Sequence, residues 1–383
     1  MPSSNAKKEL LESFLRTTDE FFSLNEFEEL IDSKKKLRIK YGVDVTSPFL
    51  HIGHAVNLWM MRELQDLGHK VIFLIGDFTT QIGDPTGRNN TRPIIPQSEI
   101  DKNADEFIRQ AKMVLRFDDP DLLEIRRNSE WFSKYNLSEF LKLLAMVTHS
   151  RLISRDMFQR RIKNQEDIYL HEMIYPILQG YDSYVLESDL TIIGSDQLFN
   201  EMLGRFYQQK FGQKPQVIIT TKITQGIDGK AKQSKSLDNY IGLGHSSRDK
   251  FGRCMKVPDE LIIDYLKIYT KISIEEISII DKEIVKDPMK WKKFLAEEII
   301  KRYHDEASAT REREWFENTF SKKIIPDDIP TMEVANSQWI AINLINKYFD
   351  NSKSNSEVRR LFKQGAVSIN GKNIPLFDDT IDI

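Results

Sequence analysis

The stretch Tyr41–His54 reads YGVDVTSPFLHIGH. It predicts a buried strand over Leu37–Asp44, a short polar turn, and a helix that begins at His51. The free N–H groups and the positive dipole end of such a helix attract anions. Two imidazoles there can donate hydrogen bonds to phosphate oxygens, and Gly53 leaves the backbone open to a flat group. The stretch therefore predicts a nucleotide triphosphate site at a strand–helix turn.

A second strand follows this helix. Lys70–Gly76 contains VIFLIG, a continuous apolar run typical of a strand buried on both faces. Two strands joined by one helix form a parallel βαβ unit, in which ligands lie at the carboxyl ends of the strands. Thr79, Asp84 and Pro85 follow the strand at that edge, in the loop DFTTQIGDPTGR. Further strands are predicted at Asp189–Ile193 and Gln216–Thr220, and mainly helical structure up to about Leu30 and from about Glu99 to Lys163.

Two motifs carry a resemblance to a known family. HIGH, which spans His51–His54, resembles the first signature of class I aminoacyl-tRNA synthetases, and KQSKS at Lys232–Ser236 resembles their KMSKS loop. Alone, each is typical of incidental histidines or of a solvated loop, whereas together, in this order, they indicate the family. The resemblance implies a Rossmann-like α/β catalytic domain that uses ATP with Mg²⁺ and has no metal site of its own. The implied catalytic residues are His51, His54, Lys232 and Lys235, and the implied ATP-binding residues are Gly53, Gly194, Asp196 and Ser234.

Two further segments narrow the resemblance to bacterial tyrosyl-tRNA synthetases. They are GDPTGR, which begins at Gly83, and YPILQGYD, which spans Tyr175–Asp182. Tyr175, Gln179 and Asp182 share one face of a helix by their spacing, which alone favours solvent-facing polar groups. The resemblance instead implies that Asp84, Tyr175 and Gln179 surround a substrate ammonium and that Asp182 accepts a hydrogen bond from the phenol. The other implied tyrosine-binding residues are Gly42, Asp44, Thr79 and Gln197.

The roles implied for the later motifs concern ATP. Asp196 of GSDQ binds the ribose hydroxyls, Gly194 lets the ribose approach, and Gln197 lies beside the substrate. Lys232 and Lys235 reach the pyrophosphate, where ammonium groups suit developing charge. A proton shuttle is not required, because the carboxylate of the amino acid is the nucleophile.

The composition excludes several classes of protein. The chain has 383 residues, of which 40% are hydrophobic and 30% charged, with a formal net charge of −3, so a polybasic binder is not expected. Cys254, the single cysteine, excludes a disulfide framework and a Cys-rich zinc site. No apolar run approaches the roughly 20 residues of a membrane span, and no signal peptide is recognisable, so a cytoplasmic protein is expected.

Three domains are expected: a catalytic domain over 1–245 with an inserted helical, dimer-interface region; a helical domain over 246–325; and an S4-like RNA-binding domain over 331–383. Pro326 and Pro330 mark the linker, and an Asn370-Gly371 turn predicts a hairpin in the tail. By resemblance, the tail helix binds tRNA, and the protein is a homodimer. The tail residues expected to contact tRNA are Arg359, Arg360 and Lys363. A basic cluster contains Arg151, Arg155, Arg160, Arg161 and Lys163. The favoured interpretation of this cluster is a solvated face, and the second is a contact with tRNA.

Four positions depart from the family pattern. Ile193 stands where the first glycine of GGTDQ is usual, Thr191 replaces a longer polar residue, Gln233 replaces the methionine of KMSKS, and Tyr41 adds bulk. Lys40 places the chain in one branch of the bacterial enzymes. The expected function is tyrosine–tRNA ligase, with tyrosine, ATP and tRNA-Tyr as partners. The alternatives are a paralogue that uses a tyrosine analogue or a non-tRNA acceptor, and a non-catalytic RNA-binding protein.

Overall fold

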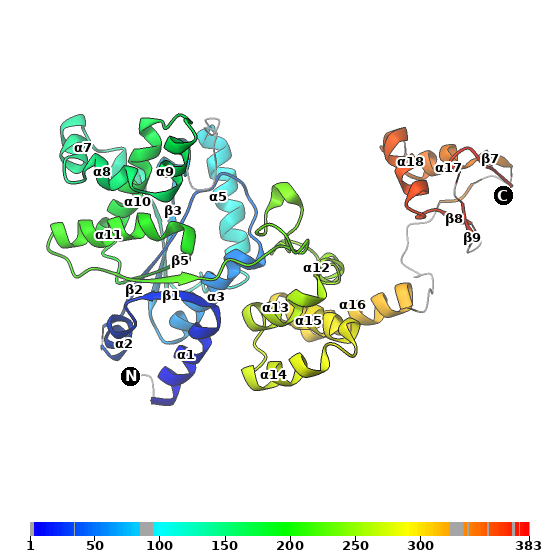
Figure 1. Ribbon diagram of the computed structural model, residues 1–383, viewed down its shortest axis with the longest axis horizontal. Coiled ribbons are helices and arrows are strands. Elements are labelled where there is room, and N and C mark those ends of the chain that lie inside the picture. The colour runs from blue at the N-terminus through cyan, green and yellow to red at the C-terminus, as the bar shows by residue number, and fades with distance from the viewer. Residues whose placement is uncertain are drawn as a thin grey trace. The chain divides into compact units, whose positions relative to one another are not determined.

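The computed structural model describes residues 4–33, 35–84, 95–321, 332–334, 337–350, 352–369, 372–374 and 376–382. The chain forms two compact units, Met1–Glu314 and Trp315–Ile383 (Figure 1). Three features expected from the sequence lie outside the described residues: Pro85 to Arg88 of GDPTGR, the linker prolines, and the Asn370-Gly371 turn. The three domain boundaries remain predictions.

A six-stranded sheet organises the first unit, in the order β1-β6-β5-β2-β3-β4. Five strands run parallel, and β1 pairs antiparallel with β6 at one edge. The four predicted strands are confirmed to within a residue or two at either end. They are β2 (Arg38–Val43), β3 (Lys70–Ile75), β5 (Leu190–Gly194) and β6 (Val217–Thr221).

The two outer strands were not predicted. The helical interpretation up to Leu30 is wrong at β1 (Thr18–Phe22), which separates α1 (Ser4–Thr17) from α2 (Leu24–Asp32). Phe21 pairs with Ile219 of β6, so a long-range partner decides the conformation of this short segment. β4 (Leu123–Arg127) likewise interrupts the region predicted as mainly helical, by pairing with β3.

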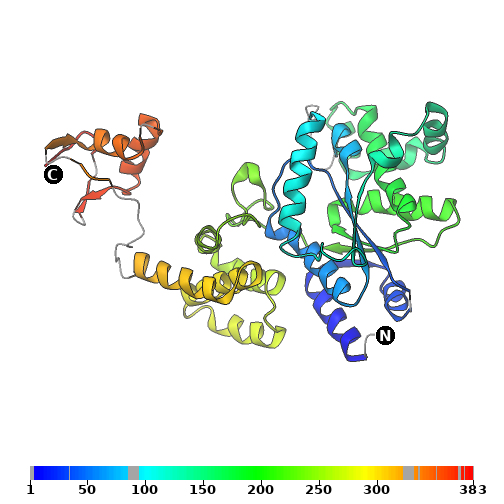
Figure 2. The ribbon, with the colours of Figure 1, turned by 180° about the vertical axis from the view of Figure 1, so that it is seen from behind.

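Helices cover both faces of the sheet. The chain passes from β2 through α3 (Ile52–Asp66) to β3, and from β5 through α11 (Leu198–Lys210) to β6, in opposite directions along the sheet. Right-handed crossovers therefore place α3 and α11 on opposite faces, as the two views show (Figures 1 and 2). The order reverses between β2 and β5. Such a switch point leaves a crevice at the carboxyl ends of its two strands.

The remaining helices of the first unit fall into two groups. Those around the sheet are α4 (Asp77–Ile82), α5 (Gln97–Ala111), α6 (Ser129–Phe132), α7 (Leu137–Leu144), α8 (His149–Ile153), α9 (Asp156–Lys163) and α10 (Leu170–Val185). Those after the sheet are α12 (Ser247–Cys254), α13 (Ile262–Tyr269), α14 (Ile274–Glu283), α15 (Pro288–Tyr303) and α16 (Glu306–Phe316). α4 corrects the expectation of a loop after β3, and the Asp77 carboxylate in its first turn accepts from the backbone N–H of Phe78.

The second unit is a small α+β fold. It contains two helices, α17 (Ala341–Tyr348) and α18 (Asn355–Lys363). Its short strands are β7 (Gln338–Ile340), β8 (Ser368–Ile369), β9 (Lys372–Asn373) and β10 (Thr380–Asp382). β8 and β9 form the antiparallel pair expected of a hairpin. A capping box at Ser354 and Glu357 starts α18. The buried core of this unit contains Ala341, Val358, Phe362, Val367, Ile374 and Ile381.

Candidate functional site

A cavity of about 390 Å³ opens at the switch point of the sheet. Its walls come from the carboxyl ends of β2 and β5 and from the first turn of α3. Of the sequence-predicted catalytic, ATP-binding and tyrosine-binding residues, all but Ser234 and Lys235 line it. The lining set is Gly42, Asp44, His51, Gly53, His54, Thr79, Asp84, Tyr175, Gln179, Asp182, Gly194, Asp196, Gln197 and Lys232.

The two histidines form the N-terminal cap of α3. His51 Nδ1 accepts from the Gly53 N–H at 3.2 Å, and His54 Nδ1 accepts from the His51 N–H at 3.3 Å. Desolvation, aided by the Lys232 ammonium, lowers the pKa of His54 to about 4 even though its side chain is accessible to solvent. Burial and the neighbouring His54 lower the pKa of His51 too. Because both Nδ1 atoms accept, the proton of each neutral ring sits on Nε2, where it can be donated to a ligand.

The KQSKS loop is held at its base by Gln233. Gln233 is buried, donates from Nε2 to the hydroxyl of Tyr269 at 2.8 Å, and accepts from the Ile241 N–H. Lys232 lies 3.5 Å from Asp196 Oδ2, within the cavity. Lys235 instead lies over the ring of Phe49, 3.4 Å from its centroid. The glutamine at this departing position therefore ties the loop to α13.

A polar cluster forms another part of the cavity wall. Tyr175 donates from its hydroxyl to Asp44 Oδ2 at 3.0 Å, and Thr79 donates to Asp44 Oδ1 at 2.8 Å. Asp84 accepts from Gln197 Nε2 at 2.8 Å. Desolvation and the carboxylate of Asp44 raise the pKa of Tyr175, which keeps its phenol protonated. Asp44, Tyr175 and Thr79 thus form one hydrogen-bonded set, and Asp84 and Gln197 belong to a second.

Asp182 is buried beneath this cluster. Trp131 Nε1 donates to its Oδ1 at 3.0 Å, and Asn128 Nδ2 lies 3.4 Å from its Oδ2. Burial raises the pKa of Asp182 to about 8, against the opposing effect of Lys40. Trp131 and Asn128 were not identified from the sequence. Trp131 lies on α6, and Asn128 directly precedes it.

Lys40 and Glu201 form a buried ion pair in the same wall. Lys40 Nζ lies 2.7 Å from Glu201 Oε2, and each side chain is only 2% exposed. No role was predicted for Lys40 from the sequence, and Glu201 was not identified. A signal was available: Glu201 lies within a helix whose buried neighbours include Leu203 and Tyr207, and a carboxylate there requires a partner.

The other departing residues take different positions. Ile193 and Tyr41 both line the cavity, and Tyr41 packs against Phe73. Thr191 does not line it; its hydroxyl donates to the carbonyl oxygen of Lys40 at 3.2 Å, so it supports β2.

The basic cluster is not a single solvated face. Arg161 is buried and pairs with Glu172 at 2.8 Å, with side chains 5% and 6% exposed. Arg155 is also buried, beside the ring of Phe199. The first interpretation is therefore wrong for these two arginines, because Arg161 of α9 pairs with α10 and Arg155, the residue before α9, lies against α11. In the second unit, three basic residues are exposed on α18: Arg359, Arg360 and Lys363. The guanidinium group of Arg359 lies over the ring of Phe377.

The described residues contain neither a cluster of metal-ligating side chains nor a helix that could span a membrane. Among these residues, no group of three or more His, Cys, Asp or Glu side chains is arranged to hold a metal ion. In the same part of the chain, every helix is too short or too polar to cross a membrane.

Sequence relatives cover most of this chain. Residues 32–321 match the family of class I tRNA synthetases for tryptophan and tyrosine. Tyrosine–tRNA ligase of Thermotoga maritima is 41% identical over 361 residues, which cover 93% of this chain and 89% of that protein. Tyrosine–tRNA ligase 2 of Clostridium acetobutylicum is 41% identical, with coverages of 92% and 89%. Tyrosine–tRNA ligase of Ralstonia nicotianae is 44% identical, with coverages of 88% and 85%.

Solved structures share the fold at lower identity. A C-terminally truncated mitochondrial tyrosyl-tRNA synthetase of Aspergillus nidulans has a TM-score of 0.67 and 23% identity, and the match covers 82% of this chain and 94% of that one. A tyrosyl-tRNA synthetase of Archaeoglobus fulgidus, solved with L-tyrosine, has a TM-score of 0.62 and 23% identity, with coverages of 80% and 99%. The solved structures show the shared fold, and the family match and the sequence relatives show that the chain belongs to the tyrosyl-tRNA synthetases of class I.

Proposed function

We propose that the protein is a tyrosine–tRNA ligase that activates tyrosine with ATP and transfers the tyrosyl group to tRNA-Tyr. One observation carries the proposal: a single cavity gathers the HIGH histidines, Asp196 and Lys232 together with the polar cluster and Asp182. The first group suits a nucleotide and the second suits a phenolic amino acid. The reaction requires these two ligands side by side.

Tyrosine is held at both ends. Its ammonium lies among Asp84, Tyr175 and Gln179, and its phenol donates to Asp182. A carboxylate that pairs with the phenol hydroxyl rejects phenylalanine, because that substrate leaves the buried group unpaired. Gly42, Asp44, Thr79 and Gln197 complete the surroundings, with Asp44 aligned by Thr79 and Tyr175.

ATP lies over the first turn of α3 and the end of β5. His51 and His54 donate from Nε2 to phosphate oxygens over Gly53, and Asp196 accepts from the ribose hydroxyls beside Gly194. A Cβ atom at Gly194 would lie 2.8 Å from Asp196 Oδ1, so glycine keeps this approach open. Ser234 and the two loop lysines complete the phosphate site. Lys235 reaches it by leaving the ring of Phe49.

The chemistry needs positioning and charge stabilisation. A carboxylate oxygen of tyrosine attacks the α-phosphorus, the bond to the bridging oxygen breaks, and pyrophosphate leaves with the electron pair. Lys232 and Lys235 stabilise the negative charge on the departing group. Further positive charge there would come from Mg²⁺ bound with ATP. A terminal ribose hydroxyl of tRNA then attacks the tyrosyl carbonyl and loses its proton, the bond from the carbonyl carbon to the phosphate oxygen breaks, and AMP leaves with the electron pair. Proximity of the bound reactants supplies much of the acceleration.

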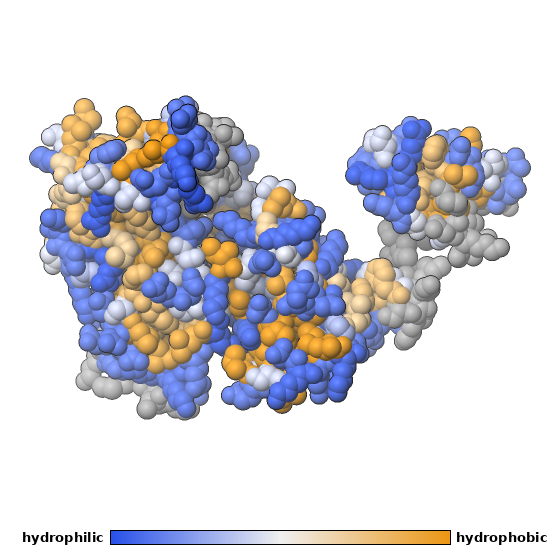
Figure 3. Space-filling model, in the orientation of Figure 1, coloured by the Kyte–Doolittle hydropathy of each residue, from blue (hydrophilic) through white to orange (hydrophobic). Residues whose placement is uncertain are grey.

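Partner surfaces are proposed on two elements. The S4-like tail binds tRNA through Arg359, Arg360 and Lys363, which are exposed on one short helix. Homodimerisation uses the region around α7, where Leu137 is 73% exposed and Leu141, one turn later, is 54% exposed. Apolar residues gather over α7 at the upper left of Figure 3. Because the sequence relatives are bacterial enzymes, and bacteria charge tRNA in the cytoplasm, we propose that location.

The test is aminoacylation of tRNA-Tyr with labelled tyrosine. The proposal predicts ATP-dependent charging that is retained by Lys230→Ala, an exposed loop variant, and lost by Asp196→Ala. Exchanging Arg359, Arg360 and Lys363 for alanine should weaken tRNA binding without changing the activation of tyrosine. Failure of the unaltered protein to charge tRNA while still activating tyrosine would favour a different acceptor.

A further inference from the structure

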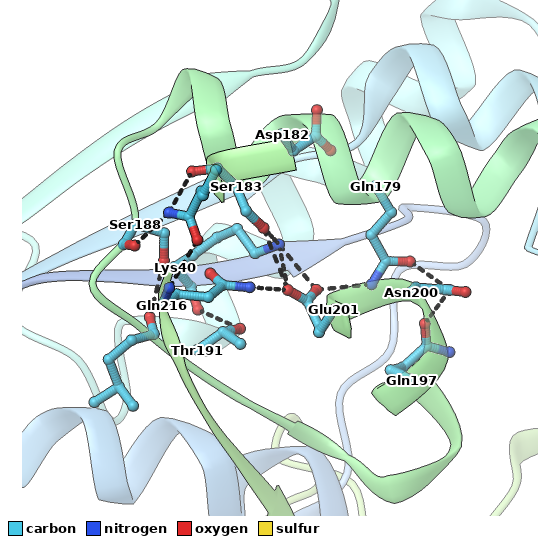
Figure 4. Close-up of polar contacts among 12 residues, drawn as sticks. Lys40, Gln179, Asp182, Ser183, Ser188, Thr191, Gln197, Asn200, Glu201 and Gln216 are labelled. Atoms are coloured by element: carbon cyan, nitrogen blue, oxygen red, sulfur yellow. Dashed lines mark hydrogen bonds and ion pairs between the residues drawn. The ribbon is translucent and has the colours of Figure 1, made fainter. Parts of the chain in front are cut away.

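Glu201 receives an unusual number of hydrogen bonds for one side chain. Its oxygens accept from Lys40 Nζ at 2.7 and 2.8 Å, and they also accept from three neutral donors (Figure 4). These donors are Gln179 Nε2 at 2.9 Å, Gln216 Nε2 at 2.8 Å and Ser183 Oγ at 3.3 Å. An ionised carboxylate can only accept, so every neighbour must turn a donor toward it.

This requirement fixes the orientation of the Gln179 amide. Its NH₂ group faces Glu201, so its carbonyl oxygen faces the other way and accepts from Asn200 Nδ2 at 2.7 Å. Asn200 also donates from Nδ2 to the carbonyl oxygen of Gln197 at 3.0 Å, so Gln179, Asn200 and Gln197 form a row of three hydrogen-bonded amides. At the far end of this row, Asp84 accepts from Gln197 Nε2. Two carboxylates, one at each end, therefore set the direction of three amides between them.

The arrangement leaves one atom unsatisfied. Asn200 Oδ1 is buried and has no hydrogen-bond partner among the described residues. Asn200 taken alone would turn its oxygen toward a donor. Both of its neighbours present carbonyl oxygens, however, so its NH₂ group has to face them. The orphaned oxygen shows that the carboxylates, and not Asn200, decide the direction of the amides.

From this geometry we infer that Glu201 is a positioning residue for the substrate ammonium, acting through Gln179. The inference rests on the proposed function, in which Gln179 binds that ammonium. An ammonium has three donors and no acceptor, so it needs oxygens. Glu201 makes Gln179 present its carbonyl oxygen, whose second lone pair remains for the substrate. A reversed amide would turn an NH₂ group toward the ammonium.

Lys40 supports this orientation indirectly. Its ammonium lies within 2.8 Å of both Glu201 oxygens and donates to each of them. The ion pair thus fixes the Glu201 carboxylate in the position in which it accepts from Gln179.

The test compares three ligands with Glu201→Gln, whose side chain has the same shape but can face Gln179 with either its oxygen or its nitrogen. L-Tyrosine and tyramine carry the ammonium, and 3-(4-hydroxyphenyl)propanoate keeps the phenol and carboxylate but lacks it. Dissociation constants are measured by calorimetry. Affinity for tyrosine and tyramine should fall about 10- to 100-fold, the range for a lost hydrogen bond to a charged group, while the propanoate changes less than twofold.

A second variant separates a loss of affinity from a loss of folding. Lys40→Met combined with Glu201→Gln removes the charge that Glu201→Gln alone would strand, and it should show the same selective loss. Gln216→Met is the matched control: it removes a donor to Glu201 outside the cavity and should leave all three affinities unchanged.

The possible results separate the two claims. An equal loss for all three ligands, or no loss for any, in a folded variant would refute the role of Glu201. Absence of tyrosine binding by the unaltered protein would refute the proposed function, and with it this inference.

Discussion

Trp131 donates a hydrogen bond from its indole nitrogen to Asp182 Oδ1 at 3.0 Å, in the core beneath the cavity. Trp131 is only 8% exposed and Asp182 only 3%. The contact fixes the carboxyl group in place, while burial raises its pKa to about 8. An aspartate in this state is poised to lose its proton when a better hydrogen-bond donor arrives.

Proton release on tyrosine binding follows from that raised pKa. Below about pH 8 the free protein holds a proton on Asp182, and the complex needs the carboxylate to accept from the phenol. Tyrosine affinity should therefore rise by up to about tenfold per pH unit toward pH 8, with about one proton released at pH 7. Calorimetry in two buffers of different ionisation enthalpy measures the released proton. Asp182→Asn should abolish the release, and a pH-independent affinity of the unaltered protein would contradict the account.

The preference for tyrosine over phenylalanine should depend strongly on Asp182 and less strongly on Trp131. A site that pairs with a substrate hydroxyl rejects the analogue without it by about 10⁴- to 10⁵-fold. Asp182→Ala should remove most of this preference for tyrosine over phenylalanine, and Trp131→Phe should reduce it about tenfold by loosening Asp182. The ratio of kcat/KM for the two amino acids is the measurement. An unchanged ratio in Asp182→Ala would mean that the phenol binds elsewhere.

The loop lysines should affect activation and not tyrosine binding. Lys235→Ala should lower the rate of adenylate formation by about 10²- to 10³-fold, as the loss of a charge-stabilising donor does elsewhere, with tyrosine affinity nearly intact. Rapid-quench measurement of adenylate, alongside equilibrium binding of tyrosine, separates the two effects. Lys230→Ala, exposed in the same segment, is the control. If Lys235→Ala abolished tyrosine binding, the assignment of the loop to pyrophosphate would be wrong.

The Lys40–Glu201 pair should govern stability as well as orientation. Lys40→Met strands a buried carboxylate and should lower the free energy of unfolding by about 3–5 kcal/mol, whereas adding Glu201→Gln should restore most of it. Removing the exposed pair between Lys8 and Glu12 should cost less than about 0.5 kcal/mol. Urea unfolding of the four proteins checks this. Equal costs for the buried and exposed pairs would contradict the burial of Lys40 and Glu201.

Gly76, at the end of β3, should not tolerate a side chain. A Cβ atom there would lie 2.4 Å from Thr79 Oγ1 and 2.5 Å from Asp44 Oδ1, two atoms that hydrogen-bond to each other. Gly76→Ala should therefore weaken tyrosine binding by displacing Asp44. Gly252→Ala on α12 meets no atom within 4 Å and should leave binding unchanged. Equal tyrosine affinities in the two variants would show that Asp44 is not held in this way.

The sequence predicted the elements whose signal is local. β3 is a run of buried apolar residues, so composition alone identifies it, whereas β2 carries Arg38 and Lys40 among its apolar residues and was recognised together with the turn and helix that follow it. The reversal of order between β2 and β5 then brings together residues that stand at the ends of separate strands. This is why motifs far apart in the chain, such as HIGH and the segment at Asp196, could be assigned to one site.

What the sequence did not predict depends on long-range partners. β1 is a strand because it pairs with β6, about two hundred residues away. Arg161 is buried because Glu172 neutralises it, and Glu201 because Lys40 does. Neither pair follows a regular spacing in the sequence that would signal it. Charged residues on amphipathic helices are ordinarily solvated, so the exceptions become visible only in three dimensions.

Tyrosine activation is measured by amino-acid-dependent exchange of pyrophosphate with ATP, with each of the twenty amino acids and several tyrosine analogues supplied separately. A tyrosine–tRNA ligase should give exchange with L-tyrosine, with phenylalanine at least a thousandfold less efficient. Ile193 and Tyr41 would then be tolerated variations in the wall of the cavity. Exchange only with an analogue, or no exchange by the folded protein with Mg²⁺ and ATP, would contradict the account.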